Sequence, residues 1–417
     1  MVFQITKVYS SPLSKCYLIL VTAFVIWHLL NPKELLDTTE YTQYGSFFFG
    51  EDSTFTSVEG YWMGFARRTP IYPLILWLTN KYVLVFLQWF ISITLPVLIY
   101  HFLALEDNSR QGKHWFWMIC GVFPLQYYYT GFYMPEIWAE LGVAIWLVAV
   151  KNRRFGIAGM ASAFLILLKP IFIFLTLLNF TISMVHYIKE RQFIETSISW
   201  ILPILAVTLL LFWNHSHGYS GISSVGTTNA YDYNRYMLIN EEKGGDYTDS
   251  LYSAEAHLLA SVSNRDMAKG EWMMNAFYRS VFDYPITYSW VHIKGMIQMF
   301  IDPGRYDAMV FFNWTESKGL LQVKSINNQG SIPIYQWFYI GFFALLSFIR
   351  LGLLWLGVRV LDFKKDWVWA SCLFILGYTF LIGPVGTARY LVPLFPIIWV
   401  FAWYGFKRIL NENSASE

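Results

Sequence analysis

Long apolar runs dominate the chain and are separated by short polar segments. Ten runs close to membrane-spanning length occupy about 16–31, 82–104, 114–132, 135–150, 155–170, 171–187, 196–213, 335–357, 366–383 and 390–406. A bilayer core about 30 Å thick needs about 20 apolar residues in each helix that crosses it. The pattern therefore predicts an all-α polytopic membrane protein with about ten transmembrane helices.

Two long segments, 32–81 and 214–334, interrupt this pattern. Within the second, 271–282 and 288–300 place apolar and aromatic residues at helical spacing, which is typical of helices lying in the membrane interface. We therefore divide the chain into an N-terminal transmembrane module (1–213, including the loop 32–81), a large loop (214–334) and a C-terminal transmembrane module with a short tail (335–417).

Positive charges predict how the chain is oriented, because cytoplasmic loops retain Lys and Arg. With ten spans, all six basic groups fall on one side, and they are Lys7 and Lys15; Arg110 and Lys113; Lys151, Arg153 and Arg154; Lys189 and Arg191; Arg359, Lys364 and Lys365; and Lys407 and Arg408. We expect both termini in the cytoplasm and both long loops outside. The first run lacks a small-residue cleavage site and is interpreted as a retained anchor.

Composition and charge exclude other classes of protein. Charged residues make up 14% of the chain, against about 25% in a soluble domain, and mean hydropathy is +0.40. A net charge of +2 argues against a broad nucleic-acid-binding face. The three cysteines lie inside apolar runs, which gives no disulfide framework and no CxxC metal clip.

The first outer loop opens with two acidic residues, Asp37 and Glu40, one helical turn apart. Asp37 is either the N-cap of a helix starting at Thr38 or a base that accepts a proton from a substrate hydroxyl. Glu40 is on the same helical face and either assists Asp37 or is simply solvated. Arg67 and Arg68 follow, and either snorkel to lipid phosphates or grip one particular phosphate.

Three more ionisable residues, Glu136, Lys169 and Arg389, lie at membrane depth near the predicted outer face. Such residues are costly in a bilayer and usually mark a pathway or a site, although each alone is also explained by a buried pair or an anchor. Together with Asp37 they indicate a base that meets an anionic lipid headgroup. His215 and His217 lack a third ligand at a defined spacing, so no metal site is predicted.

These residues form an ordered series of short motifs. The series is Asp37-x-x-x-Tyr41, Arg68-x-Pro70-x-Tyr72-Pro73, Glu136 at the start of the fourth span, Lys169-Pro170, and Ala388-Arg389-Tyr390-x-x-Pro393. In this order the chain resembles the GT-C superfamily of membrane glycosyltransferases, such as protein mannosyltransferases, lipid A aminoarabinose transferases and phage serotype-converting O-antigen glucosyltransferases. The resemblance covers 15–175 and 360–410, and only loosely the outer loop 214–334.

The resemblance implies a GT-C-like fold and a role for each motif. Asp37, assisted by Glu40, would be the catalytic base; Arg68, Arg389 and Lys169 would hold the donor phosphate; and Tyr41, Tyr72, Glu136 and Tyr390 would support them. The expected reaction moves a hexose, with glucose favoured, from a polyprenyl-phosphate (undecaprenyl) donor to an extracytoplasmic glycan such as the O-antigen of lipopolysaccharide. It would invert the anomeric carbon, without metal or cofactor, on the periplasmic side of a bacterial inner membrane. The implied partners are the lipid-linked donor, a glycan or lipid-linked glycan acceptor and membrane lipids, and no nucleic acid.

Two other functions remain open from the residues. A flippase or transporter of lipid-linked saccharides needs a polar pathway across the whole bilayer, whereas the ionisable residues here gather at the outer end. An acyltransferase would be expected to carry a catalytic His within a span, and a glycan polymerase or ligase is the remaining transferase alternative.

Overall fold

The computed structural model describes residues 11–32, 34–50, 62–104, 110–121, 124–190, 193–302, 304–312, 314 and 334–414. In these residues all regular structure is helical, which confirms the predicted all-α class. Up to the second long loop the elements are α2 (Pro12–Leu30), α3 (Leu36–Phe49), η1 (Gly64–Ala66), α4 (Ile71–Leu78), α5 (Lys81–Ala104), α6 (Arg110–Gly121), α7 (Pro124–Gly131), α8 (Glu136–Lys151), α9 (Phe155–Leu168), η2 (Pro170–Ile173), α10 (Phe174–Glu190) and α11 (Phe193–Ser216).

The second half contains the helices of the long loop 214–334 and the helices that follow it. Its elements are α12 (Ser224–Asn229), η3 (Ala230–Arg235), α13 (Tyr236–Lys243), α14 (Gly245–Ala260), α15 (Met267–Asp283), α16 (Pro285–Ile301), α17 (Arg305–Phe311), α19 (Ile334–Val360), α20 (Asp366–Ile382), η4 (Gly383–Val385), η5 (Ala388–Leu394) and α21 (Phe395–Ser414). The two predicted amphipathic stretches are thus helices, α15 and α16.

Five helices in the described part of the chain are long and apolar enough to cross a membrane: Pro12–Leu30, Lys81–Phe102, Phe193–Ser216, Gly341–Val360 and Ala388–Ile409. The pair α7 and α8 is also apolar but is bent by 118°, and three shorter apolar helices are Phe155–Leu168, Pro170–Val185 and Asp366–Ile382. A membrane protein is thereby supported, and ten spans remain a prediction. Within the predicted span 114–132, the structure describes α6 as far as Gly121 and α7 from Pro124.

The bend between α7 and α8 has a local cause. The side chain of Gln88, in α5, donates from Nε2 to the carbonyls of Tyr129 (3.0 Å) and Phe132 (2.8 Å). These bonds satisfy carbonyls that the end of α7 leaves without a helical partner. Pro135 then begins α8 as its N-cap, and this fixes Glu136 in the first turn of a buried helix.

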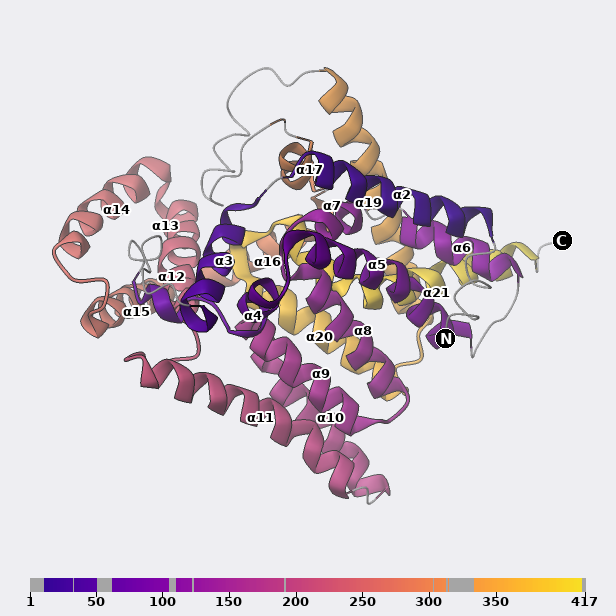
Figure 1. The fold of residues 1–417 in the computed structure, drawn as a ribbon, viewed down its shortest axis with the longest axis horizontal. Helices are drawn as coiled ribbons and strands as arrows, with labels where there is room; N and C mark the ends of the chain where they lie inside the picture. The colour runs from indigo at the N-terminus through magenta and orange to yellow at the C-terminus, as the bar shows by residue number, and fades with distance from the viewer. Residues whose placement is uncertain are drawn as a thin grey trace.

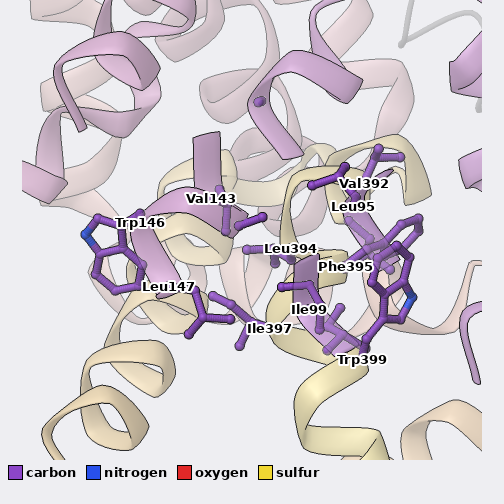
Figure 2. Packing of buried hydrophobic residues seen from close by; sticks show 14 of the residues in the cluster. Leu95, Ile99, Val143, Trp146, Leu147, Val392, Leu394, Phe395, Ile397 and Trp399 are labelled. Atoms are coloured by element: carbon purple, nitrogen blue, oxygen red, sulfur yellow. The ribbon is translucent and has the colours of Figure 1, made fainter. Parts of the chain in front are cut away.

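The core joins the two halves of the chain. In Figure 2, Leu95 and Ile99 of α5 and Val143, Trp146 and Leu147 of α8 pack against Val392, Leu394, Phe395, Ile397 and Trp399 of η5 and α21. A second close approach joins α19 to α21, where a Cβ added at Gly357 or Gly405 would overlap the backbone of the other helix. Small residues that let backbones approach are how helices associate in lipid. The packing of η5 and α21 on α5 and α8 fixes η5, which carries Arg389, against the N-terminal half.

Helices α12 to α15 lie at one end of the molecule, and the start of α2 and the end of α21 lie toward the other end of its long axis (Figure 1). Gly295 of α16 lies against Gly383 and Pro384 so closely that a Cβ would come within 2.5 Å of the Gly383 carbonyl oxygen. Gly386, with φ +55°, makes the turn that leads into η5. Helix α16, in the second long loop, therefore holds the segment just before Arg389.

Candidate functional site

Asp37 is in the first turn of α3 and is not its N-cap. The N-cap is Leu35, with no side-chain capping bond, so the capping interpretation of Asp37 is wrong. A carboxylate in the first turn is still favoured by the helix dipole. Since it does not cap the helix, its oxygens are available to other groups.

The Asp37 carboxylate is shared by two arginines from opposite ends of the chain. Oδ1 accepts from Nη2 of Arg68 at 2.8 Å, and Oδ2 accepts from Nη2 of Arg389 at 2.9 Å. Burial by itself would raise the pKa of Asp37, but the two guanidinium groups outweigh it and hold the pKa well below its usual range. Asp37, Arg68 and Arg389 therefore share one site, as predicted.

Glu40 lies one turn further along α3 and holds the arginines. Its Oε2 accepts from Nε of Arg68 at 2.8 Å and from Nε of Arg67 at 3.1 Å. The snorkelling interpretation of Arg67 and Arg68 is wrong, because both guanidinium groups turn inward onto Glu40. The solvated interpretation of Glu40 is also wrong, since the residue is only 8% exposed.

Aromatic side chains support the arginines. The guanidinium of Arg68 lies 4.6 Å from the ring centre of Tyr41, whose ring meets that of Tyr72 edge-on at 4.9 Å. Arg389 donates from Nη2 to the hydroxyl of Tyr390 at 3.1 Å. Cation–π contacts and ring packing restrict where the charged groups can move.

Lys169 pairs with Glu136 rather than with Asp37. Its Nζ donates to Oε1 of Glu136 at 2.7 Å and lies 5.8 Å from the ring centre of Tyr390. Pro170 ends α9 immediately after Lys169, which places this ammonium at the helix end. The buried-pair interpretation is correct for these two residues, and their pair borders the Asp37 cluster through Tyr390.

Several buried polar atoms around this site have no hydrogen-bond partner in the described residues. They are Tyr72 Oη, Glu136 Oε2, Tyr378 Oη, Thr387 Oγ1 and Arg389 Nε. The hydroxyls of Tyr72 and Tyr378 are both near enough to Glu136 to interact with its charge. Buried polar groups are nearly always paired with protein or water, so these atoms are donors and acceptors that water or a ligand can pair.

Three contacts around the site were not predicted from the sequence. Arg67 donates from Nη1 to Thr228 Oγ1 at 3.3 Å and so links Glu40 to the outer loop. Asp302 accepts the Ala388 N–H at 3.1 Å and thereby caps the element that carries Arg389. Burial raises the pKa of Asp307 to about 7, although the Tyr129 hydroxyl donates to it at 2.6 Å. Isolated aspartates in a loop give no sequence signal for such contacts.

In the described part of the chain, no three His, Cys, Asp or Glu side chains gather as a metal site. Comparison of the chain with known protein families, with curated proteins and with solved structures finds no match. The function is therefore inferred from the geometry of five charged side chains, here called the ion cluster: Asp37, Glu40, Arg67, Arg68 and Arg389.

Proposed function

We propose that this protein is an integral-membrane, inverting glycosyltransferase that moves a hexose from a polyprenyl-phosphate donor to an extracytoplasmic glycan. The observation that carries the proposal is the sharing of one carboxylate, Asp37, by Arg68 and Arg389. A base beside two guanidinium groups is the arrangement needed to deprotonate a hydroxyl while a phosphate leaves.

The reaction is a single displacement at the anomeric carbon. Asp37 takes the proton of the acceptor hydroxyl, the acceptor oxygen forms the new glycosidic bond, and the bond from the anomeric carbon to the phosphate oxygen breaks. The electron pair of that bond goes to the polyprenyl phosphate, whose added charge Arg68 and Arg389 stabilise. Preorganised charges of this kind are often the largest single contribution to catalysis. Attack opposite the leaving phosphate inverts the configuration.

Ligand binding also explains how Asp37 becomes basic. While Arg68 and Arg389 hold the carboxylate, its pKa is too low for it to accept a proton readily. A phosphate that takes over these guanidinium groups removes the cause of the depressed pKa. The pKa then rises toward the usual value for Asp, and the base is activated only when the donor is present.

The membrane location favours a lipid-linked donor. Nucleotide sugars are not expected outside the cytoplasm, so a transferase acting on the outer face needs a sugar carried by a lipid. The five long apolar helices support a membrane protein. The outward position of the ion cluster follows from the positive-inside orientation and is part of the proposal. Glucose as the sugar and O-antigen as the acceptor are the specific case that the resemblance favours.

The test is reconstitution of the purified chain with a radiolabelled polyprenyl-phosphate hexose and a lipopolysaccharide acceptor. We expect transfer by the wild type and loss of about 10²- to 10⁴-fold in Asp37→Asn, the usual contribution of a general base. Asp283→Asn, an exposed carboxylate of α15, is the matched control. Full transfer by a folded Asp37→Asn variant, or movement of intact labelled donor across the vesicle membrane without transfer, would contradict the proposal.

A further inference from the structure

A cavity of about 550 Å³ lies among the outer-loop helices, next to the ion cluster but separate from it. Its walls include Trp62, Thr228, Tyr231, Asp232, Tyr252 and Lys269. The volume is within the range of about 300–1,000 Å³ that is usual for small-molecule sites. None of the residues assigned to the glycosyl-transfer step lines it.

The aromatic walls are held in place by a buried ion pair. Arg235 donates from Nη1 and Nη2 to the two carboxylate oxygens of Glu255 at 2.6 and 2.8 Å. Glu255 also accepts from the Tyr231 hydroxyl at 2.5 Å, and Tyr252 donates to the Tyr231 carbonyl at 2.6 Å. A bidentate pair of this kind fixes orientation as well as position. The rings of Tyr231 and Tyr252 are therefore preorganised.

Trp62, another wall of the cavity, is held by residues at the start of α15. Its Nε1 donates to the Asp266 carbonyl at 2.8 Å, and its ring covers Gly270, where any Cβ would overlap it. Lys269 donates to Asn264 Oδ1 at 2.7 Å. By contrast, the carboxylate of Asp232 has no hydrogen-bond partner in the part of the chain that is described.

The backbone that carries Tyr231 and Asp232 is a π-helix, η3, over Ala230–Arg235. Such turns are rare and frequently occur at functional sites. The next residue, Tyr233, is close enough to Tyr390 and Asp37 to interact with their charges. Thr228, just before η3, receives the hydrogen bond of Arg67. One irregular turn thus borders both the cavity and the ion cluster.

These walls have the chemistry that recognises a sugar. A pyranose has apolar C–H faces and a rim of hydroxyl groups, so it needs aromatic surfaces together with hydrogen-bonding side chains. Trp62 and Tyr252 provide amphipathic aromatic surface. Asp232 is a strong acceptor for hydroxyl groups, and Lys269 is a donor. The opposite charges of these two residues fit a neutral ligand better than an anion.

We propose that this cavity is the acceptor subsite and binds a neutral saccharide of two or more rings, with Asp232 accepting hydrogen bonds from its hydroxyl groups. The acceptor sugar that receives the hexose would then extend from the cavity past Arg67 toward Asp37. The assignment of the cavity as an acceptor subsite rests on the proposed transferase function. Binding of a saccharide there does not require that transfer occurs.

Binding is tested on an array of bacterial O-antigen and core oligosaccharides, probed with the full-length, detergent-purified and fluorescently labelled protein without donor. We expect the wild type to bind at least one neutral oligosaccharide. Asp232→Asn should weaken this binding about tenfold or more, because a hydrogen bond to a charged acceptor is replaced by a weaker neutral one. Asp249→Asn is the matched control, since Asp249 bonds Tyr236 outside the cavity.

Lys269→Met gives a second variant, and thermal melting confirms that each variant is folded. Unchanged binding in both cavity variants, or a wild type that binds no saccharide on the array, would overturn the proposal. Steady-state kinetics give an independent check, because Asp232→Asn should raise the acceptor KM and leave the donor KM unchanged. If saccharides bind and no transfer is ever detected, the transferase proposal fails and the saccharide site stands.

Discussion

Replacing Asp37 by Asn should have opposite effects on two properties of the protein. Transfer should fall because the base is lost, while binding of a prenyl phosphate without a sugar should become tighter. The second effect follows from the geometry, since Arg68 and Arg389 now each give an Nη2 donor to the carboxylate at 2.8 and 2.9 Å. The amide of Asn carries no charge, so it no longer competes with the phosphate for these two Nη2 donors, while Arg68 stays paired with Glu40.

The size of the gain is set by the repulsion that the substitution removes. A phosphate oxygen bound to the same Nη2 atoms lies roughly 4 Å from the carboxylate, where two unit charges at an effective dielectric constant of about 20 interact by about 4 kcal/mol. The side chains of Asp37, Arg68 and Arg389 are 21%, 13% and 18% exposed. Screening at this exposure and the lost ion pairs reduce the net gain to about 1–2 kcal/mol, or about 5- to 30-fold in affinity.

Isothermal titration calorimetry with geranylgeranyl phosphate in detergent measures this affinity directly. Wild type, Asp37→Asn and the control Asp283→Asn are titrated at pH 7 and at two salt concentrations. The control should match the wild type. Affinity in Asp37→Asn that is equal to or below that of the wild type would refute the idea that the phosphate and Asp37 compete for the same arginines, whatever happens to transfer.

Three further results are expected from the described contacts. Burial, opposed by Arg67, raises the pKa of Asp232 to about 6, so the carboxylate form is present above that pH. Acceptor affinity measured by surface plasmon resonance should therefore fall as the pH decreases through about 6. The affinity of Asp232→Asn should not show this fall. Gly386→Ala should lower the melting temperature and the transfer rate together, because φ is +55° there and a Cβ would come within 2.9 Å of the Gly295 carbonyl oxygen. Lys169→Met should destabilise the protein by about 3–5 kcal/mol, since it leaves the fully buried Glu136 unpaired. Adding Glu136→Gln should restore most of the melting temperature in a fluorescence size-exclusion assay. No recovery in the double variant would count against the pairing.

The titration of Asp232 also depends on its neighbours. Tyr233 on the same turn, Tyr252 on α14 and Arg67 beside η1 all interact with its charge, and Lys269 of α15 lines the same cavity. None of these four neighbours has an ordinary pKa near 6. The midpoint near pH 6 should therefore disappear when Asp232 alone is replaced.

The sequence predicted the residue types of the site better than their contacts. Asp37, Arg68 and Arg389 could be grouped because charged residues are rare in so apolar a chain, and each one near a membrane needs a reason. Their convergence depends on the packing of η5 against α5 and α8. This packing brings Arg389 to Asp37, 352 positions away in the chain. No local pattern encodes that distance.

Other features followed from tertiary contacts that the sequence does not reveal. Asp37 was a plausible N-cap for a helix starting at Thr38, but α3 starts two residues earlier, at Leu36. The Asp37 carboxylate bonds to Arg68 and Arg389 instead. The π-helix η3 has no recognised sequence signature, so the cavity beside it could only be found in three dimensions.

The charges of the ion cluster fit the charge of the donor at each stage of the proposed reaction. Three guanidinium groups and two carboxylates leave one net positive charge, which a donor phosphodiester with one negative charge neutralises. When transfer is complete, Asp37 carries the acceptor proton and the cluster has two positive charges. The leaving polyprenyl phosphate is then a monoester that carries about 1.5 to 2 negative charges near neutral pH. The balance is kept throughout, so the chemical step requires no buried excess charge. Release of the product is the step that needs a change, because the monoester separates from the arginines most easily once Asp37 loses its proton and takes the guanidinium groups back.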